Sequence, residues 1–218
     1  MKTVFISGIS RGIGKALAQK FLASGDFVIG TSTSGNANFF HENLRVLPLK
    51  LSEPKSIEKC AEEASALDRK IDILINNAGF FHEKDESLVI DTAVFREVLE
   101  VNLIGQIDLT ERLIPLMNDA GHIINVSSRR ASFNYEHEMN YPCYSISKTA
   151  LNMFTKFLAS RLKGKITISA VHPGFVKTDM NEGEGDITPE EAAEDIYTLA
   201  NSKIESGKFW FKGGEFPW

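Results

Sequence analysis

The sequence has few cysteines, no long apolar run and no excess of basic residues. Cys60 and Cys143, the only cysteines among 218 residues, are too few for a disulfide framework or a zinc site, and the five histidines show no ligand spacing, so no metal is expected. No segment approaches about 18 uninterrupted apolar residues, so no membrane span is expected, and no signal peptide is evident. The net charge of −5 argues against a nucleic-acid partner, and a reducing cytoplasm is the expected location.

Short apolar runs alternate with longer amphipathic segments along the whole chain. The runs predict strands at residues 3–7, 27–31, 44–49, 71–75, 122–127, 165–171 and 208–211. Helices are predicted between them, including residues 92–117 and 142–163, and Pro142 and Pro189 each suit a helix's first turn. This alternation predicts a doubly wound α/β fold in one domain over residues 1–218, with helices on both faces of a parallel sheet of about seven strands.

The stretch "SGISRGIG" joins the first predicted strand to the first helix. Gly8, Gly12 and Gly14 permit a tight turn and close backbone approach to a pyrophosphate, and the following helix offers free N–H groups to it. The spacing differs from the commoner Gly-x-Gly-x-x-Gly. A glycine-rich loop can be a plain turn, but its place after the first strand favours nucleotide binding.

Tyr144 and Lys148 stand one helical turn apart in "NYPCYSISKTAL". Residues i and i+4 share a helix face, with β-carbons roughly 5–6 Å apart. A positive charge about 4 Å away would lower the pKa of a phenol, ordinarily near 10, by about 3. The pair is therefore predicted to form an acid/base that works near neutral pH. Taken alone, this pattern is more often an accidental pair on a solvated helix face.

Four motifs together resemble the short-chain dehydrogenase/reductases. They are the "GISRGIG" loop, the "NNAG" of residues 76–79, the Tyr144/Lys148 pair and the "HPGFVKTDM" after the sixth predicted strand. The motifs stand in the family's order and span nearly the whole chain. The resemblance implies a Rossmann-type fold, a nicotinamide cofactor and hydride exchange between a carbonyl and an alcohol.

The resemblance also implies catalytic roles. Tyr144 would protonate the carbonyl oxygen, and Lys148 would depress its pKa and hold the nicotinamide ribose. Ser128 would hydrogen-bond the same oxygen. The gap from Ser128 to Tyr144 is longer than is usual in the family, so Ser127 and Ser132 are alternatives.

Asn102, in "EVNLIG", matches the helix asparagine that holds a water of the proton relay in the family. The alternative is a mid-helix asparagine hydrogen-bonded to a neighbouring backbone group.

By the same resemblance, residues along the crevice would contact the cofactor. The "NNAG" segment would lie against the adenosine ribose, and residues 173–178 would hold the nicotinamide carboxamide. Lys50 cannot accept a hydrogen bond from adenine, so that contact falls to the backbone around Leu51. The full predicted set is Gly8, Ser10, Arg11, Gly12, Ile13, Gly14, Ser32, Thr33, Leu51, Asn77, Ala78, Gly79, Tyr144, Lys148, Pro173, Gly174, Val176 and Thr178.

The segment after the second predicted strand favours NADP(H) over NAD(H). An NAD enzyme of this fold usually places an acidic residue there, whereas this chain has Ser32 and Thr33. No carboxylate at these positions would repel a 2′-phosphate, and Arg11 adds a cation that can bind phosphate bidentately. The alternative for Arg11 is a solvated surface charge.

The substrate side shows a short, glycine-containing segment, residues 181–187, where the family usually has a long lid. It predicts a mobile lid and an open pocket. Arg129 and Arg130 follow Ser128 and either attract an acidic or acyl-carrier substrate or stay solvated. An aromatic wall or plain core packing is predicted for Phe80, Phe81, Phe133, Tyr135 and Tyr141.

Three functions are compatible with these residues. The first is an NADPH-dependent reductase of a small or medium ketone or aldehyde, and the second is a 3-oxoacyl thioester reductase. The third is a sensor that binds the nucleotide without turnover. The family implies a homodimer or homotetramer built through the long helices, here residues 92–117 and 142–163.

Overall fold

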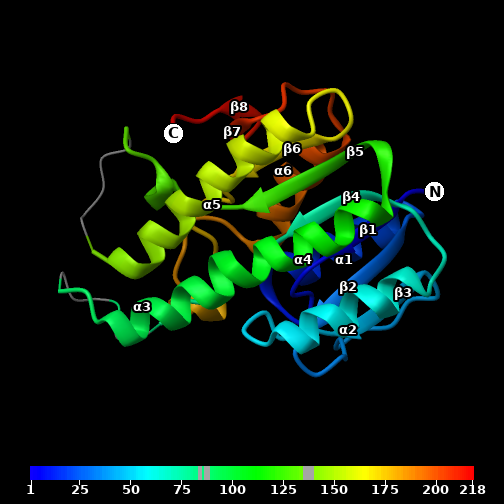
Figure 1. Cartoon of the computed structure of the whole chain (residues 1–218), viewed down its shortest axis with the longest axis horizontal. Helices are drawn as coiled ribbons and strands as arrows, with labels where there is room; N and C mark the ends of the chain where they lie inside the picture. Colours follow the sequence, from blue (N-terminus) through cyan, green and yellow to red (C-terminus); the bar gives the residue numbers. More distant parts are fainter. Residues whose placement is uncertain (83–84, 86–88, 135–139) are drawn as a thin grey trace.

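The computed structural model describes residues 1–82, 85, 89–134 and 140–218. Strands and helices alternate along the chain (Figure 1). The strands are β1 (Thr3–Ile6), β2 (Phe27–Ser32), β3 (Leu44–Pro48), β4 (Ile71–Asn76), β5 (Met117–Val126), β6 (Thr167–Val171), β7 (Lys208–Phe211) and β8 (Gly214–Glu215). The α-helices are α1 (Gly12–Ala23), α2 (Pro54–Ser65), α3 (Thr92–Leu99), α4 (Gly105–Leu113), α5 (Pro142–Arg161) and α6 (Pro189–Asn201).

All of these strands belong to one sheet, in the order β3-β2-β1-β4-β5-β6-β7-β8. The pairs from β3 to β7 are parallel, as predicted. The strand order reverses between β1 and β4, and ligands bind beyond the carboxyl ends of the strands at such a switch point. The doubly wound α/β fold is confirmed.

The sheet has an eighth strand that the sequence pattern did not predict. β8 pairs antiparallel with β7 through a two-residue turn. Lys212 and Gly213 have φ values of 46° and 74°, which is the backbone of a tight primed hairpin turn. A strand of two residues is too short to show an alternating pattern, so the estimate of about seven strands was one short.

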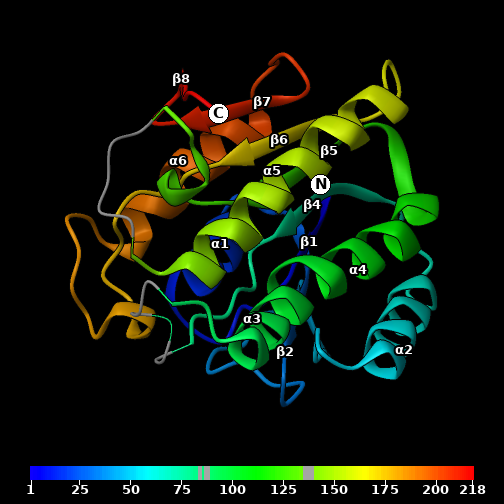
Figure 2. The ribbon, with the colours of Figure 1, turned by 60° about the vertical axis from the view of Figure 1, so that its left-hand side comes forward.

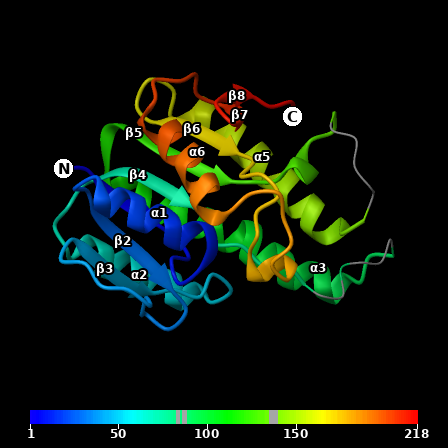
Figure 3. The same cartoon turned by 180° about the vertical axis from the view of Figure 1, so that it is seen from behind.

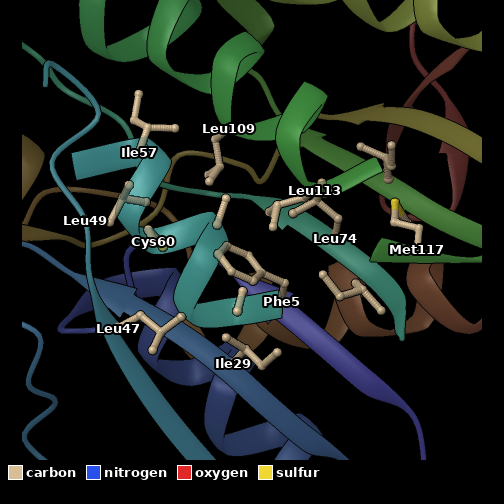
Figure 4. Close-up of a cluster of buried hydrophobic side chains, with 14 of the residues drawn as sticks. Phe5, Ile29, Leu47, Leu49, Ile57, Cys60, Leu74, Leu109, Leu113 and Met117 are labelled. Atoms are coloured by element: carbon tan, nitrogen blue, oxygen red, sulfur yellow. The ribbon is translucent and has the colours of Figure 1, made fainter. Parts of the chain in front are cut away.

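The helices cover both faces of the sheet. α1 and α6 pack on one face, seen from behind in Figure 3, around a cluster that includes Leu17, Phe21 and Ile196. α2, α4 and α5 cover the other face (Figure 2). There, Phe5 and Leu74 from the sheet meet Ile57, Cys60, Leu109 and Leu113 from the helices (Figure 4). Burial of these apolar side chains is the main force that holds helix and sheet together.

The single helix predicted over residues 92–117 is wrong in two respects. α3 passes into a π-helical segment, Glu100–Ile104, before α4 begins. α4 then ends in a 3₁₀ turn that contains Pro115, and Met117 already belongs to β5. Apolar periodicity alone does not distinguish a π turn from an α turn, because both keep the same side chains near the sheet.

Two features are absent from the described residues. No helix among them is both long and apolar enough to cross a bilayer. No group of three or more His, Cys, Asp or Glu side chains within this part of the chain gathers in a way that suits a metal ion.

Candidate active site

The loop between β1 and α1 turns tightly because of its glycines. Gly8 and Gly12 have φ values of 75° and 55°, in the left-handed region that glycine adopts without strain. A Cβ atom on Gly14 would lie 2.0 Å from the carbonyl oxygen of Gly8 and 2.4 Å from Nδ2 of Asn77. No side chain fits at position 14, so the close approach of α1 to the end of β1 depends on this glycine.

The start of α1 suits an anion. Arg11, its N-cap residue, makes no side-chain capping bond, and the first turn contains no acidic residue in this fully described stretch. The first N–H groups of the helix and the positive end of its dipole are therefore not compensated by side chains. Such a helix start binds phosphate groups well. The residues present thus fit the pyrophosphate of a dinucleotide.

Asn77 ties the end of β4 to the glycine loop. Its Nδ2 atom donates to the carbonyl oxygens of Ser7 at 2.9 Å and Gly8 at 3.0 Å. The hydroxyl of Ser7 accepts from the backbone N–H groups of Asn77 and Ala78, both at 3.0 Å. The two segments predicted to line the cofactor crevice are therefore joined directly.

Tyr144 and Lys148 both project from the first turns of α5. Pro142 is at the start of this helix, as predicted. Lys148 is only 3% exposed, and its Nζ atom donates to the carbonyl oxygen of Val126 at 2.9 Å. The same atom lies 5.7 Å from the centre of the Tyr144 ring. The ammonium is thus at the end of β5, close to the phenol but bonded to the backbone.

The prediction that the pKa of Tyr144 is lowered is wrong. Burial raises the pKa of this half-buried tyrosine, and a hydrogen bond from Ser128 and the charge of Arg130 offset the rise only in part. Burial also lowers the pKa of Lys148 to about 8, so the amine carries its charge less readily than an exposed lysine.

Of the three candidate serines, Ser128 is the one that the structure brings to Tyr144. Its hydroxyl is near enough to the phenol to lower the pKa of Tyr144. The hydroxyl of Ser127 instead donates to the carbonyl oxygen of Lys148 at 3.5 Å, in the interior. Ser132 accepts from the N–H group of Asn134 at 3.2 Å. The long gap before Tyr144 therefore does not displace Ser128 from the phenol.

Asn102 lies in the π-helical segment and is fully buried. Its Oδ1 atom accepts from the N–H group of Phe80 at 2.7 Å, and its Nδ2 atom donates to the carbonyl oxygen of Phe80 at 2.8 Å. Nδ2 also lies 3.2 Å from the hydroxyl of Ser147 on α5. Asn102 thus fixes the loop after β4 against two helices. Its backbone partner lies 22 positions away in the chain, so it is not the neighbouring group of the alternative prediction, and the role in a proton relay stays a prediction.

Residues 173–187 fold into a compact loop after β6. Gly174 has a φ of 96°. The methyl group of Thr178 lies 3.4 Å from where a Cβ of Gly12 would be, so this loop meets the glycine loop. The side-chain oxygen of Asn181 accepts from the N–H group of Thr178 at 3.1 Å. The backbone N–H group of Asp186 donates to the carbonyl oxygen of Phe175 at 2.7 Å. These bonds tie the segment to itself, which argues against the predicted mobile lid.

The residues predicted near a 2′-phosphate differ in their exposure and in their bonding partners. Thr33 is exposed, whereas Ser32 is buried and its hydroxyl donates to the carbonyl oxygen of Asn36 at 2.7 Å. Arg11 is exposed and forms an ion pair with Asp179 at 3.3 Å. The sequence analysis did not identify Asp179, because Thr178 is the only residue of "KTDM" with a predicted role.

Aromatic side chains do gather beside Tyr144. The ring of Phe81 packs edge-on against Tyr141 at 4.9 Å and Tyr144 at 5.7 Å between centres. The guanidinium of Arg130 lies 4.7 Å from the Tyr141 ring centre. Phe133 is 85% exposed and so is not part of a packed wall. Tyr135, also predicted for this wall, lies outside the described residues.

A hollow of about 500 Å³ adjoins the predicted adenine end of the crevice. It lies near the end of β3 and beside α3 and the π-helical segment. Its lining consists of Ser52, Phe80, Arg96, Glu97, Glu100 and Val101. Lys50 turns away to pair with Glu53 at 3.1 Å, which leaves the backbone around Leu51 for the adenine contact predicted from the sequence.

Comparison with known proteins agrees with this arrangement. The model of the short chain dehydrogenase family matches residues 2–188. This chain belongs to that family. It is an oxidoreductase that acts on CH–OH and C=O groups, and the predicted resemblance is confirmed.

Relatives and solved structures of the family add detail. The chain is 36% identical to 3-oxoacyl-acyl-carrier-protein reductase FabG of Aquifex aeolicus, over 82% of this chain and 75% of the relative. It is 32% identical to the enzyme of the same name from Escherichia coli K12, over 85% and 78% of the two chains. A short-chain dehydrogenase/reductase from Burkholderia multivorans with bound NADP superposes with a TM-score of 0.91 at 25% identity, over 100% and 99% of the chains. An NADPH-bound carbonyl reductase from chicken fatty liver gives 0.86 at 27% identity, over 100% and 94%.

Proposed function

We propose that this short-chain dehydrogenase reduces a ketone or aldehyde with NADPH. The observation that carries the proposal is the placement of Ser128, just after β5, beside Tyr144, whose pKa it lowers, with Lys148 one turn further along α5. A carbonyl oxygen held by these two hydroxyls would have a donor for the charge that develops on it and a proton source in reach.

The raised pKa of Tyr144 suits reduction. A buried phenol with a raised pKa stays protonated at neutral pH, and the protonated form is the one that gives a proton to the carbonyl oxygen. Lys148, next to the phenol, would stabilise the negative charge left on Tyr144 after the proton has moved. The nicotinamide cofactor supplies the hydride when it is bound.

The proposed cofactor contacts follow the crevice. Gly8, Ser10, Gly12, Ile13 and Gly14 would hold the pyrophosphate at the start of α1. Asn77, Ala78 and Gly79 would lie against the adenosine half, and Lys148 against the nicotinamide ribose. Pro173, Gly174, Val176 and Thr178 would hold the carboxamide. The missing carboxylate after β2 and the exposed Arg11 support NADP(H) rather than NAD(H).

A 3-oxoacyl thioester is the second candidate substrate. The relatives with 32–36% identity are named as reductases of that class. Arg130 acts electrostatically on Tyr144, so its charge is close to the reacting group and within reach of an acidic carrier. A nucleotide sensor without turnover is less favoured, because Ser128, Tyr144 and Lys148 are all in place.

A substrate screen with both nicotinamide cofactors tests these proposals. Simple ketones and aldehydes are compared with acetoacetyl-coenzyme A at neutral pH, and binding of NADPH is measured separately by fluorescence. Turnover of the simple carbonyls supports the first proposal, and turnover of the thioester alone supports the second. Tight NADPH binding with no turnover of either class would contradict both and favour a sensor.

The variant Tyr144→Phe is the control for the assigned acid. Its turnover should fall by at least about a hundredfold, the lower end of the usual range for general acid catalysis. NADPH binding should stay within about twofold, because the ring is retained and only the hydroxyl is lost. Unchanged turnover would refute the role of Tyr144.

We also propose an oligomeric state and a cellular location. A homodimer or homotetramer is proposed because short-chain dehydrogenases commonly associate. Cys60 and Cys143 are free and buried, which is consistent with the reducing cytoplasm that we propose as the location.

A further inference from the structure

The helix that carries Tyr144 and Lys148 begins without a cap of its own. Tyr141, at the N-cap position, has left-handed backbone angles of 57° and 56° and makes no side-chain capping bond. Pro142, the first helical residue, has no N–H group. The first N–H groups that need a partner therefore belong to Cys143 and Tyr144. An unbonded buried N–H group at this point would cost free energy, so a partner from elsewhere is required.

Asp85 provides that partner from the loop after β4. Its carboxylate oxygens accept from the N–H group of Cys143 at 3.0 Å and from that of Tyr144 at 2.9 Å. The two residues lie 58 and 59 positions further along the chain. Asp85 is only 2% exposed. A buried carboxylate needs such donors, and the positive end of the α5 dipole favours its charge.

The contact reaches Tyr144 itself rather than only its helix. One oxygen of Asp85 bonds the backbone N–H of Tyr144, and the other holds the preceding residue, so the carboxylate fixes the start of the helix at two points. The loop that bears Asp85 also bears Phe81, whose ring touches Tyr144, and it is held from the other side by Asn102 through Phe80. The phenol is therefore held in a frame built from β4, the π-helical segment and α5.

A rival role for Asp85 is activation of Cys143 as a nucleophile. Burial and the nearby Asp85 carboxylate raise the pKa of Cys143 to about 12, so the thiol stays protonated. Cys143 is also 1% exposed. Neither property suits a reactive cysteine.

We propose that Asp85 is a positioning residue that holds Tyr144 at the carbonyl-binding point, by binding the start of α5 across the crevice. This inference rests on the proposed function. A displacement of about 1 Å at a reacting group costs up to about a hundredfold in rate, so loss of the carboxylate should lower turnover as well as stability.

The test compares Asp85→Ala and Asp85→Asn with Asp91→Ala. Asp91 caps the neighbouring helix α3, where its side chain accepts from the N–H group of Ala93 at 2.8 Å, and α3 carries no proposed catalytic residue. The control thus loses an aspartate cap as well, but one that is exposed and binds a single N–H group. Thermal unfolding, the Kd of NADPH, kcat for a carbonyl substrate and amide hydrogen exchange of residues 143–148 are measured for each variant.

Asp85→Ala should lower kcat by about ten- to a hundredfold, with the Kd of NADPH within about twofold. Asp85→Asn keeps one acceptor oxygen and should be intermediate, which also keeps the test open if the alanine variant does not fold. Asp91→Ala should lose stability with kcat unchanged. Equal kcat values in the Asp85 and Asp91 variants would overturn the proposal and leave Asp85 as a simple cap.

The amide exchange separates this inference from the proposed function. If the wild-type chain turns over no carbonyl, the proposed function fails on that result alone. Faster exchange of residues 143–148 in both Asp85 variants, and not in Asp91→Ala, would still support the bond between Asp85 and Tyr144. Unchanged exchange there would overturn it.

Discussion

Lys148 is anchored to Val126: its Nζ atom donates to the carbonyl oxygen at the end of β5 at 2.9 Å. This bond holds a nearly fully buried amine between the sheet and Tyr144 and explains where the amine lies. Its burial explains why the charged form costs free energy. Burial removes water from the charged form, so the pKa of Lys148 falls to about 8 from the ordinary value of 10.5. A residue kept for chemistry is therefore expected to lower stability.

The first prediction concerns stability and pH. Between pH 8 and 10.5 the unfolded chain binds a proton at Lys148 and the folded chain does not, so the contribution of Lys148 to stability rises with pH. The slope is measured between pH 8 and 9, because above pH 9 the raised pKa values of Cys60 and Cys143 contribute a slope of opposite sign. The cost is fully present below pH 8 and amounts to about 3 kcal/mol. Lys148→Met should abolish this slope in urea unfolding at a series of pH values. Lys163→Met, at an exposed position, should keep it. A slope that survives in Lys148→Met would contradict the assignment.

The second prediction concerns the cofactor's 2′-phosphate. Asp179 pairs with Arg11 at 3.3 Å, and both side chains are more than two-thirds exposed. A phosphate that needs Arg11 must compete with this carboxylate. Because an exposed pair is worth roughly 0.2–1 kcal/mol, Asp179→Asn should tighten NADPH binding by up to about fivefold and leave NADH unchanged. Arg11→Ala should weaken NADPH alone. Calorimetry with both cofactors measures this, and equal effects on NADPH and NADH would refute it.

The third prediction concerns Gly14. A methyl group there would clash with the carbonyl oxygen of Gly8 and the amide of Asn77, neither of which can move freely. Gly14→Ala should therefore destabilise the chain by about 1–3 kcal/mol and abolish NADPH binding. Gly25, at the other end of α1, has a φ of 83° and open space around it. Gly25→Ala should lose about 1 kcal/mol and still bind NADPH. Normal binding by Gly14→Ala would exclude the loop as the pyrophosphate site.

The fourth prediction concerns assembly. Ile146, Met153 and Phe157 repeat along α5 and are 40%, 67% and 62% exposed. Residues at this spacing share a helix face, and such an apolar stripe favours association. The wild-type chain should be a dimer or tetramer by light scattering, and Phe157→Glu should reduce its mass. Phe40→Glu, at a position 91% exposed in a loop, should not. A wild-type monomer would show that α5 does not serve this purpose.

Local patterns made much of this protein predictable from its sequence. The glycine spacing, the proline at the start of α5 and the apolar strands depend on near neighbours in the chain, so seven strands and the order of the fold follow from them. The pairing of Tyr144 with Lys148 on one helix face is local for the same reason. β8 and the π-helical segment were not predicted, because two and five residues are too few to show a distinct repeat of apolar side chains.

Only the tertiary structure decided what each group meets and how deeply it is buried. It brought Ser128 rather than Ser127 or Ser132 to the phenol, and it joined Asp85 to Tyr144 across 59 positions. It also reversed the expected direction of the pKa of Tyr144, because desolvation depends on every element packed around the ring and outweighs the hydrogen bond and nearby charge. Spacing along a helix determines which side chains are neighbours, whereas their charge and protonation depend on the whole fold.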